Sequence, residues 1–239
     1  MSIMMYLLAP LHRHFDRGFG AMADAYVAGA AALEDGEWTD KRLNGHLPIA
    51  FLRRHAVELY LKSAIVIFHR HLHLPYGPAS WDGPPKVLLG KGWEPFYKVH
   101  SVADLFRYYM MLFEQHSDFL ANNTRTNWSF TPELPVWIDM IQKWDPDSTL
   151  SRYPTTKDGV HDYTKGSAIE LDPNDILAQM EAGGKPVKAV VVGDAEDNVL
   201  ATYTHVDNPM SNLNSALRQA CSELSDTHAA LRGELTAGW

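Results

Sequence analysis

The stretch 47–74, LPIAFLRRHAVELYLKSAIVIFHRHLHL, decides the fold of this chain. Read as a helix at about 100° per residue, it carries its polar residues in a stripe about a third of the circumference wide. Apolar residues cover most of the rest. A helix with this distribution is surrounded by neighbours, so we expect a central helix whose stripe faces a cleft, a partner or paired charges. The stripe consists of Arg54, His55, Glu58, Lys62, His69 and His73.

Amphipathic patterns on both sides of this stretch predict further helices around it. Apolar residues recur every three or four positions over 10–34, 100–116, 132–143 and 209–235. The segment 75–99 follows the central stretch. It contains five prolines and four glycines and is expected to be a long loop. No βαβ rhythm occurs, which argues against a doubly wound sheet. We therefore expect a mainly α fold, a bundle of about four or five helices.

One later segment lacks the helical pattern of the rest. In 155–207 the sequence favours turns and strands, and the runs at 188–193 and 199–206 flank a polar turn. That pattern predicts a β-hairpin, and 173–183 predicts a short helix before it. We expect a single domain over 1–239, in which this β-containing insertion comes before the last helix.

Composition limits the class of function. The chain has 239 residues, of which 46% are apolar and 21% charged, as in ordinary globular proteins. A net charge of −8 disfavours nucleic-acid binding over the whole surface, although a local basic cleft stays open. The single cysteine, Cys221, excludes an internal disulfide and fits a core position in a reducing cytoplasm. The sequence shows neither a signal peptide nor a membrane-spanning run, so we expect a cytoplasmic protein that has no membrane partner.

Three local patterns, in chain order, resemble the HEPN superfamily of helical-bundle domains. The segment 54–64, RHAVELYLKSA, is similar to that family's A-x-E-x-x-L-K core helix. The segment 100–105, HSVADL, is similar to its H-D-L-x-x-L helix start, with Ser101 and Val102 as departures. The turn RYP at 152–154 is similar to one found before the last helix in some HEPN branches.

The resemblance implies a HEPN-like bundle, and because such bundles often dimerise we expect a homodimer. Many HEPN relatives are metal-independent ribonucleases of bacterial toxin–antitoxin, phage-defence or stress systems, while others bind nucleotides or partner proteins. The ribonuclease branch carries an Arg-x(4–6)-His motif, which this chain lacks. The resemblance covers about 45–155 and the last helix, and it leaves the β insertion unexplained.

Six residues are the candidate site. A histidine supplies an acid or base near neutral pH, and an arginine binds phosphate or stabilises developing charge. With a ribose 2′-hydroxyl as nucleophile, such a pair could cleave RNA without a metal or cofactor. We assign His100 and Arg152 as catalytic residues, and Arg54, His55, Glu58 and Lys62 as the binding cleft.

The same residues allow a structural interpretation. Glu58 is spaced i,i+4 from both Arg54 and Lys62, so the stripe could be an ion-pair network that holds other helices in place. His69 and His73 share a face, but no carboxylate completes a zinc motif, so we interpret them as cations at a helix end rather than a metal site. Two functions stay open. One is RNA or nucleotide handling, by an atypical metal-independent endoribonuclease; the other is a non-catalytic dimerisation or partner-binding module.

Overall fold

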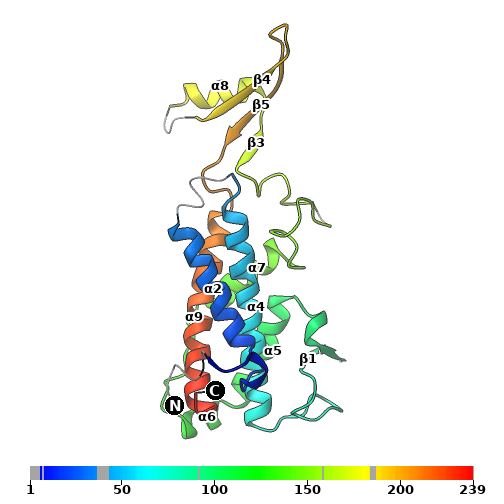
Figure 1. Cartoon of the computed structure of the whole chain (residues 1–239), viewed down its shortest axis with the longest axis vertical. Coiled ribbons are helices and arrows are strands. Elements are labelled where there is room, and N and C mark those ends of the chain that lie inside the picture. The colour runs from blue at the N-terminus through cyan, green and yellow to red at the C-terminus, as the bar shows by residue number, and fades with distance from the viewer. Residues whose placement is uncertain are drawn as a thin grey trace.

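The computed structural model describes residues 6, 8–36, 43–90, 92–157, 159–183 and 187–238. Within these ranges the chain forms seven α-helices and two small antiparallel sheets, which confirms the expected mainly α fold. Figure 1 shows a long helical bundle with a β-containing arm extending from one end. Residues 1–5 and 37–42, where the sequence has an apolar start and a polar link, lie outside the described residues.

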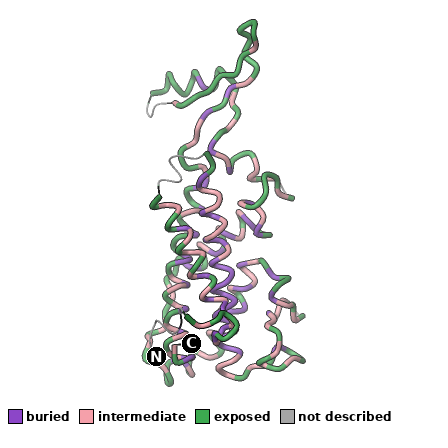
Figure 2. Tube along the Cα trace, in the orientation of Figure 1, coloured by how far each residue is buried: buried purple, intermediate pink, exposed green. Residues whose placement is uncertain are grey.

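The central helix is α4, His46–His71, close to the predicted 47–74. It packs against three other helices: α2, Phe19–Asp35; α5, Val102–Gln115; and α9, Ser211–Leu235. Buried residues occupy nearly every side of its middle turns, and Figure 2 shows them as an almost continuous purple segment. A helix that is apolar almost all round is stable only inside such a ring of neighbours.

The helix predicted over 10–34 starts later than expected. Only a short 3₁₀ turn forms at Leu11–Arg13, and α2 begins at Phe19. The carboxylate of Asp16 accepts hydrogen bonds from the backbone N–H of Gly18 at 2.9 Å and of Gly20 at 2.6 Å. Gly18 has φ of 85°, a left-handed conformation that ends any helix arriving from Pro10. The apolar periodicity continued through this break, and so the predicted start was wrong.

The expected loop at 75–99 contains regular structure. Strands β1, Lys86–Leu89, and β2, Gly92–Pro95, form an antiparallel hairpin, followed by a 3₁₀ turn at Phe96–Lys98. Gly90 in the turn has φ of 56°, which favours glycine, and the side chain of Val87 is fully buried. Gly90, Gly92 and Pro95 therefore belong to a small hairpin, while the other prolines and glycines of this segment lie in the irregular stretch 75–85 before it.

Three shorter helices complete the bundle. The helix expected at 132–143 is α7, Leu134–Trp144, and the one expected from His100 is α5, which begins at Val102. Ser101 caps α5 by accepting a hydrogen bond from the backbone N–H of Asp104 at 3.2 Å. The helix α6, Ser117–Asn123, was missed because its polar, asparagine-rich sequence favours a turn.

The arm has the predicted hairpin and helix. Strands β4, Ala189–Gly193, and β5, Val199–His205, form the hairpin, and α8 spans Pro173–Glu181. A short strand that the sequence did not predict, β3 at Ala168–Glu170, pairs with the other side of β5, so the strand order is β3-β5-β4. No helix in the described ranges is both long and apolar enough to span a lipid bilayer.

Candidate functional site

Glu58 on α4 is the centre of the polar stripe. Its carboxylate accepts a hydrogen bond from Lys62 Nζ at 2.7 Å and another from Arg54 Nη1 at 3.3 Å. His100 Nδ1 lies 3.2 Å from the same carboxylate, at the residue just before the cap of α5. Arg54 also donates to the backbone carbonyl of His100. The structure thus brings together four of the six predicted residues.

These charged side chains are buried, and positive groups are paired with negative ones. Exposed fractions are 2% for Arg54, 1% for Glu58 and 4% for Lys62. Burial alone would raise the pKa of Glu58, but the nearby ammonium of Lys62 and guanidinium of Arg54 outweigh it and lower that pKa. Asp145, after α7, places Oδ2 3.9 Å from Arg54 Nε. Two cations therefore face two carboxylates in the interior, and little net charge remains for a ligand.

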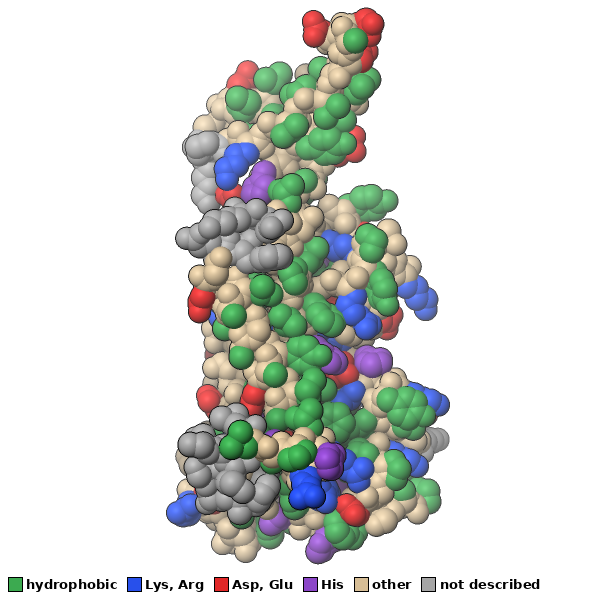
Figure 3. Space-filling model, viewed as in Figure 1, with side chains coloured by type: hydrophobic (Ala, Val, Ile, Leu, Met, Phe, Trp, Pro, Cys, Tyr) green, Lys and Arg blue, Asp and Glu red, His purple; other side chains and the backbone are tan. Residues whose placement is uncertain are grey.

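His100 is the part of this cluster that reaches solvent. Its side chain is 47% exposed and lines a groove of about 340 Å³. With Nδ1 directed at Glu58, the other ring nitrogen is free to face that groove, an orientation used by general bases. The groove also contains the carboxylates of Glu94, Asp104 and Asp147, and among the described residues that line it Lys98 adds the one fixed positive charge. On the face drawn in Figure 3, histidines lie beside basic and acidic side chains about half-way along the bundle.

Arg152 and His55 are not bonded to this cluster in the described part of the chain. Arg152 Nε donates to the carbonyl of Ser148 at 2.6 Å, and its guanidinium stacks over the Tyr153 ring at 5.5 Å. His55 packs against the rings of Tyr26 and Phe51, and burial lowers its pKa. Arg152 is close enough to His55 to lower that pKa further, so both lie at the margin of the stripe.

His69 and His73, which share a helical face in the sequence, separate in the structure. His69 is 1% exposed and has both ring nitrogens in hydrogen bonds, to the Leu74 carbonyl and to Tyr108 Oη, each at 2.8 Å. His73 lies beyond the end of α4 and packs against the Trp81 ring. His69 is therefore a core histidine, and both belong to the packing at this end of the bundle.

The buried His69 makes stability depend on pH. Burial lowers the pKa of His69 to about 4, below its usual 6.5. The unfolded chain therefore binds a proton first, so stability is lost as pH falls from about 6.5 toward 4. We expect His69 to reduce the free energy of unfolding by about 2 kcal/mol between pH 7 and 5. Urea unfolding at both pH values measures this. His69→Gln should show a smaller loss, and an equal loss would contradict the assignment.

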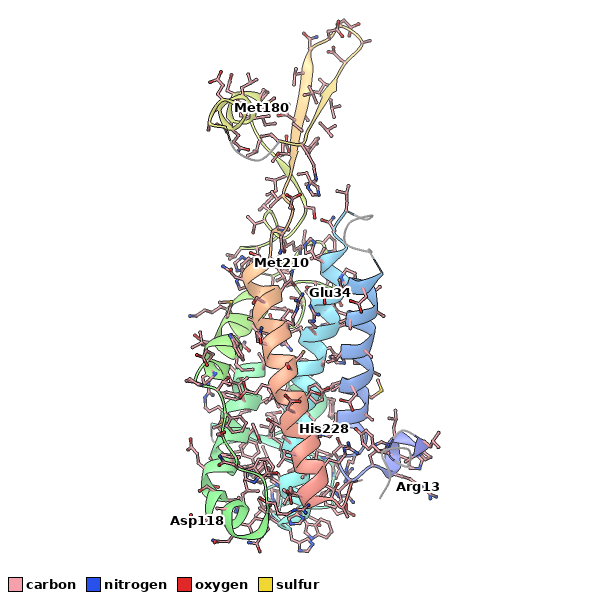
Figure 4. The ribbon with its side chains drawn as sticks, turned by 90° about the vertical axis from the view of Figure 1, so that its left-hand side faces the viewer. Arg13, Glu34, Asp118, Met180, Met210 and His228 are labelled. Carbon is pink, nitrogen blue, oxygen red and sulfur yellow. The ribbon has the colours of Figure 1, made fainter. Side chains whose placement is uncertain are left out.

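A second buried network was missed by sequence reasoning. Ser63 on α4 donates to Asp16 Oδ2 at 2.6 Å, and His228 Nδ1 on α9 lies 3.0 Å from the Ser63 hydroxyl. The other His228 nitrogen lies 3.2 Å from Tyr6 Oη. Figure 4 labels His228 on the lower half of α9. Burial lowers the pKa of His228, although Asp16 and Asp24 partly oppose this. A neutral imidazole protonated on Nδ1 donates to Ser63, and its Nε2 accepts from the Tyr6 hydroxyl, whose single proton it shares with Asp24 Oδ2 at 3.4 Å.

This Asp16–Ser63–His228 network has the residue types of a hydrolase triad but not its access. Ser63 is fully buried, so no substrate can reach its hydroxyl. The network joins the segment before α2 to α4 and α9 and is structural. The signal in the sequence was one serine, in the middle of an apolar helix, that needed a buried partner. Its partners are too far away in the chain for spacing to identify them.

No protein-family model, curated protein or solved structure matches this chain. The site is therefore interpreted from its own geometry.

Proposed function

We propose that this chain is a HEPN-like bundle that works as a non-catalytic association module. The observation that carries this proposal is the burial of Arg54, Glu58 and Lys62, whose charges are used on one another. A cleft that binds a polyanion needs basic groups open to solvent, and these are not. The bundle then serves as a rigid support, and the β-containing arm offers the exposed apolar surface that an association needs.

A second candidate is favoured by one observation, the contact between Glu58 and His100. A buried carboxylate that orients a half-exposed imidazole is an arrangement used in acid–base catalysis. In that case the protein handles RNA or a nucleotide in a bacterial stress, toxin–antitoxin or phage-defence system, with Arg152 at the margin of the polar stripe. The three carboxylates of the groove repel phosphate, which is why this candidate comes second.

An RNA assay separates the two functions. Purified protein is incubated with structured and single-stranded RNA, with and without EDTA, beside the variants His100→Ala and Arg152→Ala. Arg107→Ala is a matched control, since Arg107 is an exposed arginine that forms an ion pair with Asp104 on the surface. We expect no cleavage above background and equal, weak RNA binding by all four proteins. Cleavage that survives EDTA and is lost in the first two variants, but not in the control, would replace the association module by a ribonuclease.

A further inference from the structure

The edge strand of the arm, β4, is apolar, and the register shift at Val192/Gly193 places its extra residue, Leu200, on β5 rather than on the outer edge. Ala189–Gly193 carries no charged residue, and its three valines are exposed, at 63% for Val190, 60% for Val191 and 42% for Val192. Figure 3 shows hydrophobic side chains following the arm to an acidic tip. Soluble proteins normally protect such edges with charges, prolines or bulges, because an open edge pairs with other strands. An exposed edge strand of this composition indicates that another protein chain covers it when the protein functions.

The backbone of β4 has one free side. Lys188 accepts a hydrogen bond from His205 N at 2.9 Å, and Asp194 N donates to Asn198 O at 3.0 Å. Since hydrogen-bonding direction alternates along a strand, the even-numbered residues of β4 face β5. The odd-numbered residues Ala189, Val191 and Gly193 therefore turn their N–H and C=O groups to the other edge. Within the described residues, β5 is the only strand paired with β4.

This free edge is complementary to itself. If a second β4 runs antiparallel with Val191 opposite Val191, the outward backbone groups of Ala189 and Gly193 also face each other. The side chains of Val190 and Val192 then meet in the closely spaced pairs. One step further out, Lys188 of each chain lies opposite Asp194 of the other, so the two charges that border the apolar strand are of opposite sign. Opposite charges facing across a strand pair are stabilising.

Other registers satisfy fewer of these conditions. Centring the pair on Val190 or Val192 also keeps the outward-facing backbone groups opposite one another, but it pairs only three of the five residues of each β4, and Lys188 no longer lies opposite Asp194. Centring it on Ala189 or Gly193 pairs a single residue of each β4 and places Lys188 opposite Val190, or Asp194 opposite Val192. Among the pairings centred on a residue of β4, the one at Val191 pairs all five residues of each strand and also brings the two opposite charges together.

We infer that two copies of this chain associate by pairing β4 with β4 across a two-fold axis at Val191. The three-stranded sheet of each arm becomes half of a continuous sheet ordered β3-β5-β4-β4-β5-β3. The partner is thus a second copy of the chain, and the inference rests on the association role proposed above. The acidic tips, with Asp194, Glu196 and Asp197, then lie beside the opposite ends of the paired strands rather than beside each other.

Val191→Pro tests this pairing directly. Proline removes the N–H of Val191, which faces the free edge, and leaves the bonds to β5 in place. By symmetry the dimer loses two hydrogen bonds, and its dissociation constant in sedimentation equilibrium should rise about tenfold or more. Val191→Thr, which keeps both the N–H and the branched side chain, should dimerise like the native chain. A native chain that stays monomeric, or a proline variant that dimerises equally well, would overturn the inference.

Cross-linking tests the register. Val190→Cys and Val192→Cys proteins should form a disulfide-linked dimer when they are mixed, and far less of it when each is oxidised alone. The native Cys221 does not interfere, because it is buried and burial raises its pKa to about 12. Cross-links that form equally well without mixing, or not at all, would contradict the register.

The two proposals can fail separately. A dimer that survives Val191→Pro refutes the β4 pairing but leaves association intact, through another surface. EDTA-resistant RNA cleavage that depends on His100 refutes the association module whatever the state of the arm.

Discussion

Replacing Glu58 by glutamine is expected to lower the free energy of unfolding by about 3–5 kcal/mol, because it leaves buried cations without a counter-ion. Arg54 and Lys62 both lie against this carboxylate at 3.3 Å and 2.7 Å, and neither side chain reaches solvent. Glutamine has nearly the same volume, so the loss reports the charge and not a cavity. Urea unfolding of the two proteins at neutral pH measures the difference.

A matched control lies on α7. Asp139 and Lys143 are also spaced i,i+4, with a 3.0 Å contact, but their side chains are 65% and 76% exposed. Asp139→Asn should therefore cost less than about 1 kcal/mol. If Glu58→Gln costs no more than this control, the cluster on α4 is not a structural network.

The second large effect is expected for Gly20→Ala. A Cβ at Gly20 would lie 2.1 Å from Cε1 of His228 and 2.8 Å from Oδ2 of Asp16. The imidazole would have to move, and its hydrogen bonds with Ser63 and Tyr6 would break. Overpacking together with buried polar groups that lose their partners should cost about 3 kcal/mol or more.

Gly29→Ala, on the same helix, is the control for this prediction. There the nearest atom to an added Cβ is Cδ1 of Leu52 at 3.7 Å, an ordinary contact. Alanine in a helix interior is favoured over glycine by about 0.5–1 kcal/mol, so this variant should be slightly more stable than the native chain. The two substitutions should differ in sign, and similar melting temperatures for both would contradict the packing around His228.

The fold was predictable where one local pattern decides the outcome. The apolar repeat marked α4 and α9, and two runs rich in β-branched residues on either side of a polar turn marked the hairpin of the arm. The start of α2 was not predictable, because it depends on Asp16 bonding to the backbone of Gly18 and Gly20, which leaves no mark on the apolar repeat.

The site was predictable only in part, for a related reason. Residues one helical turn apart must be neighbours, so the contacts of Glu58 with Arg54 and Lys62 followed from spacing alone. The contact with His100 depends on how α5 packs on α4, and spacing along the sequence does not show it. The position of Arg152 depends on the loop after α7, and a loop has no periodicity from which its course can be read.

The central claim is that the charges on α4 stabilise the bundle and bind no ligand. Its most direct test is the association constant of the variant Arg54→Met, Glu58→Leu, Lys62→Met, Asp145→Asn, measured by sedimentation equilibrium beside the native chain; the fourth change removes the buried carboxylate that faces Arg54. Apolar replacements of a complete buried ion network are often neutral or stabilising, so the variant should fold. The account predicts that it also associates as tightly as the native chain. A variant that folds normally but has lost its association, or one that has lost an RNA affinity present in the native chain, would contradict the claim.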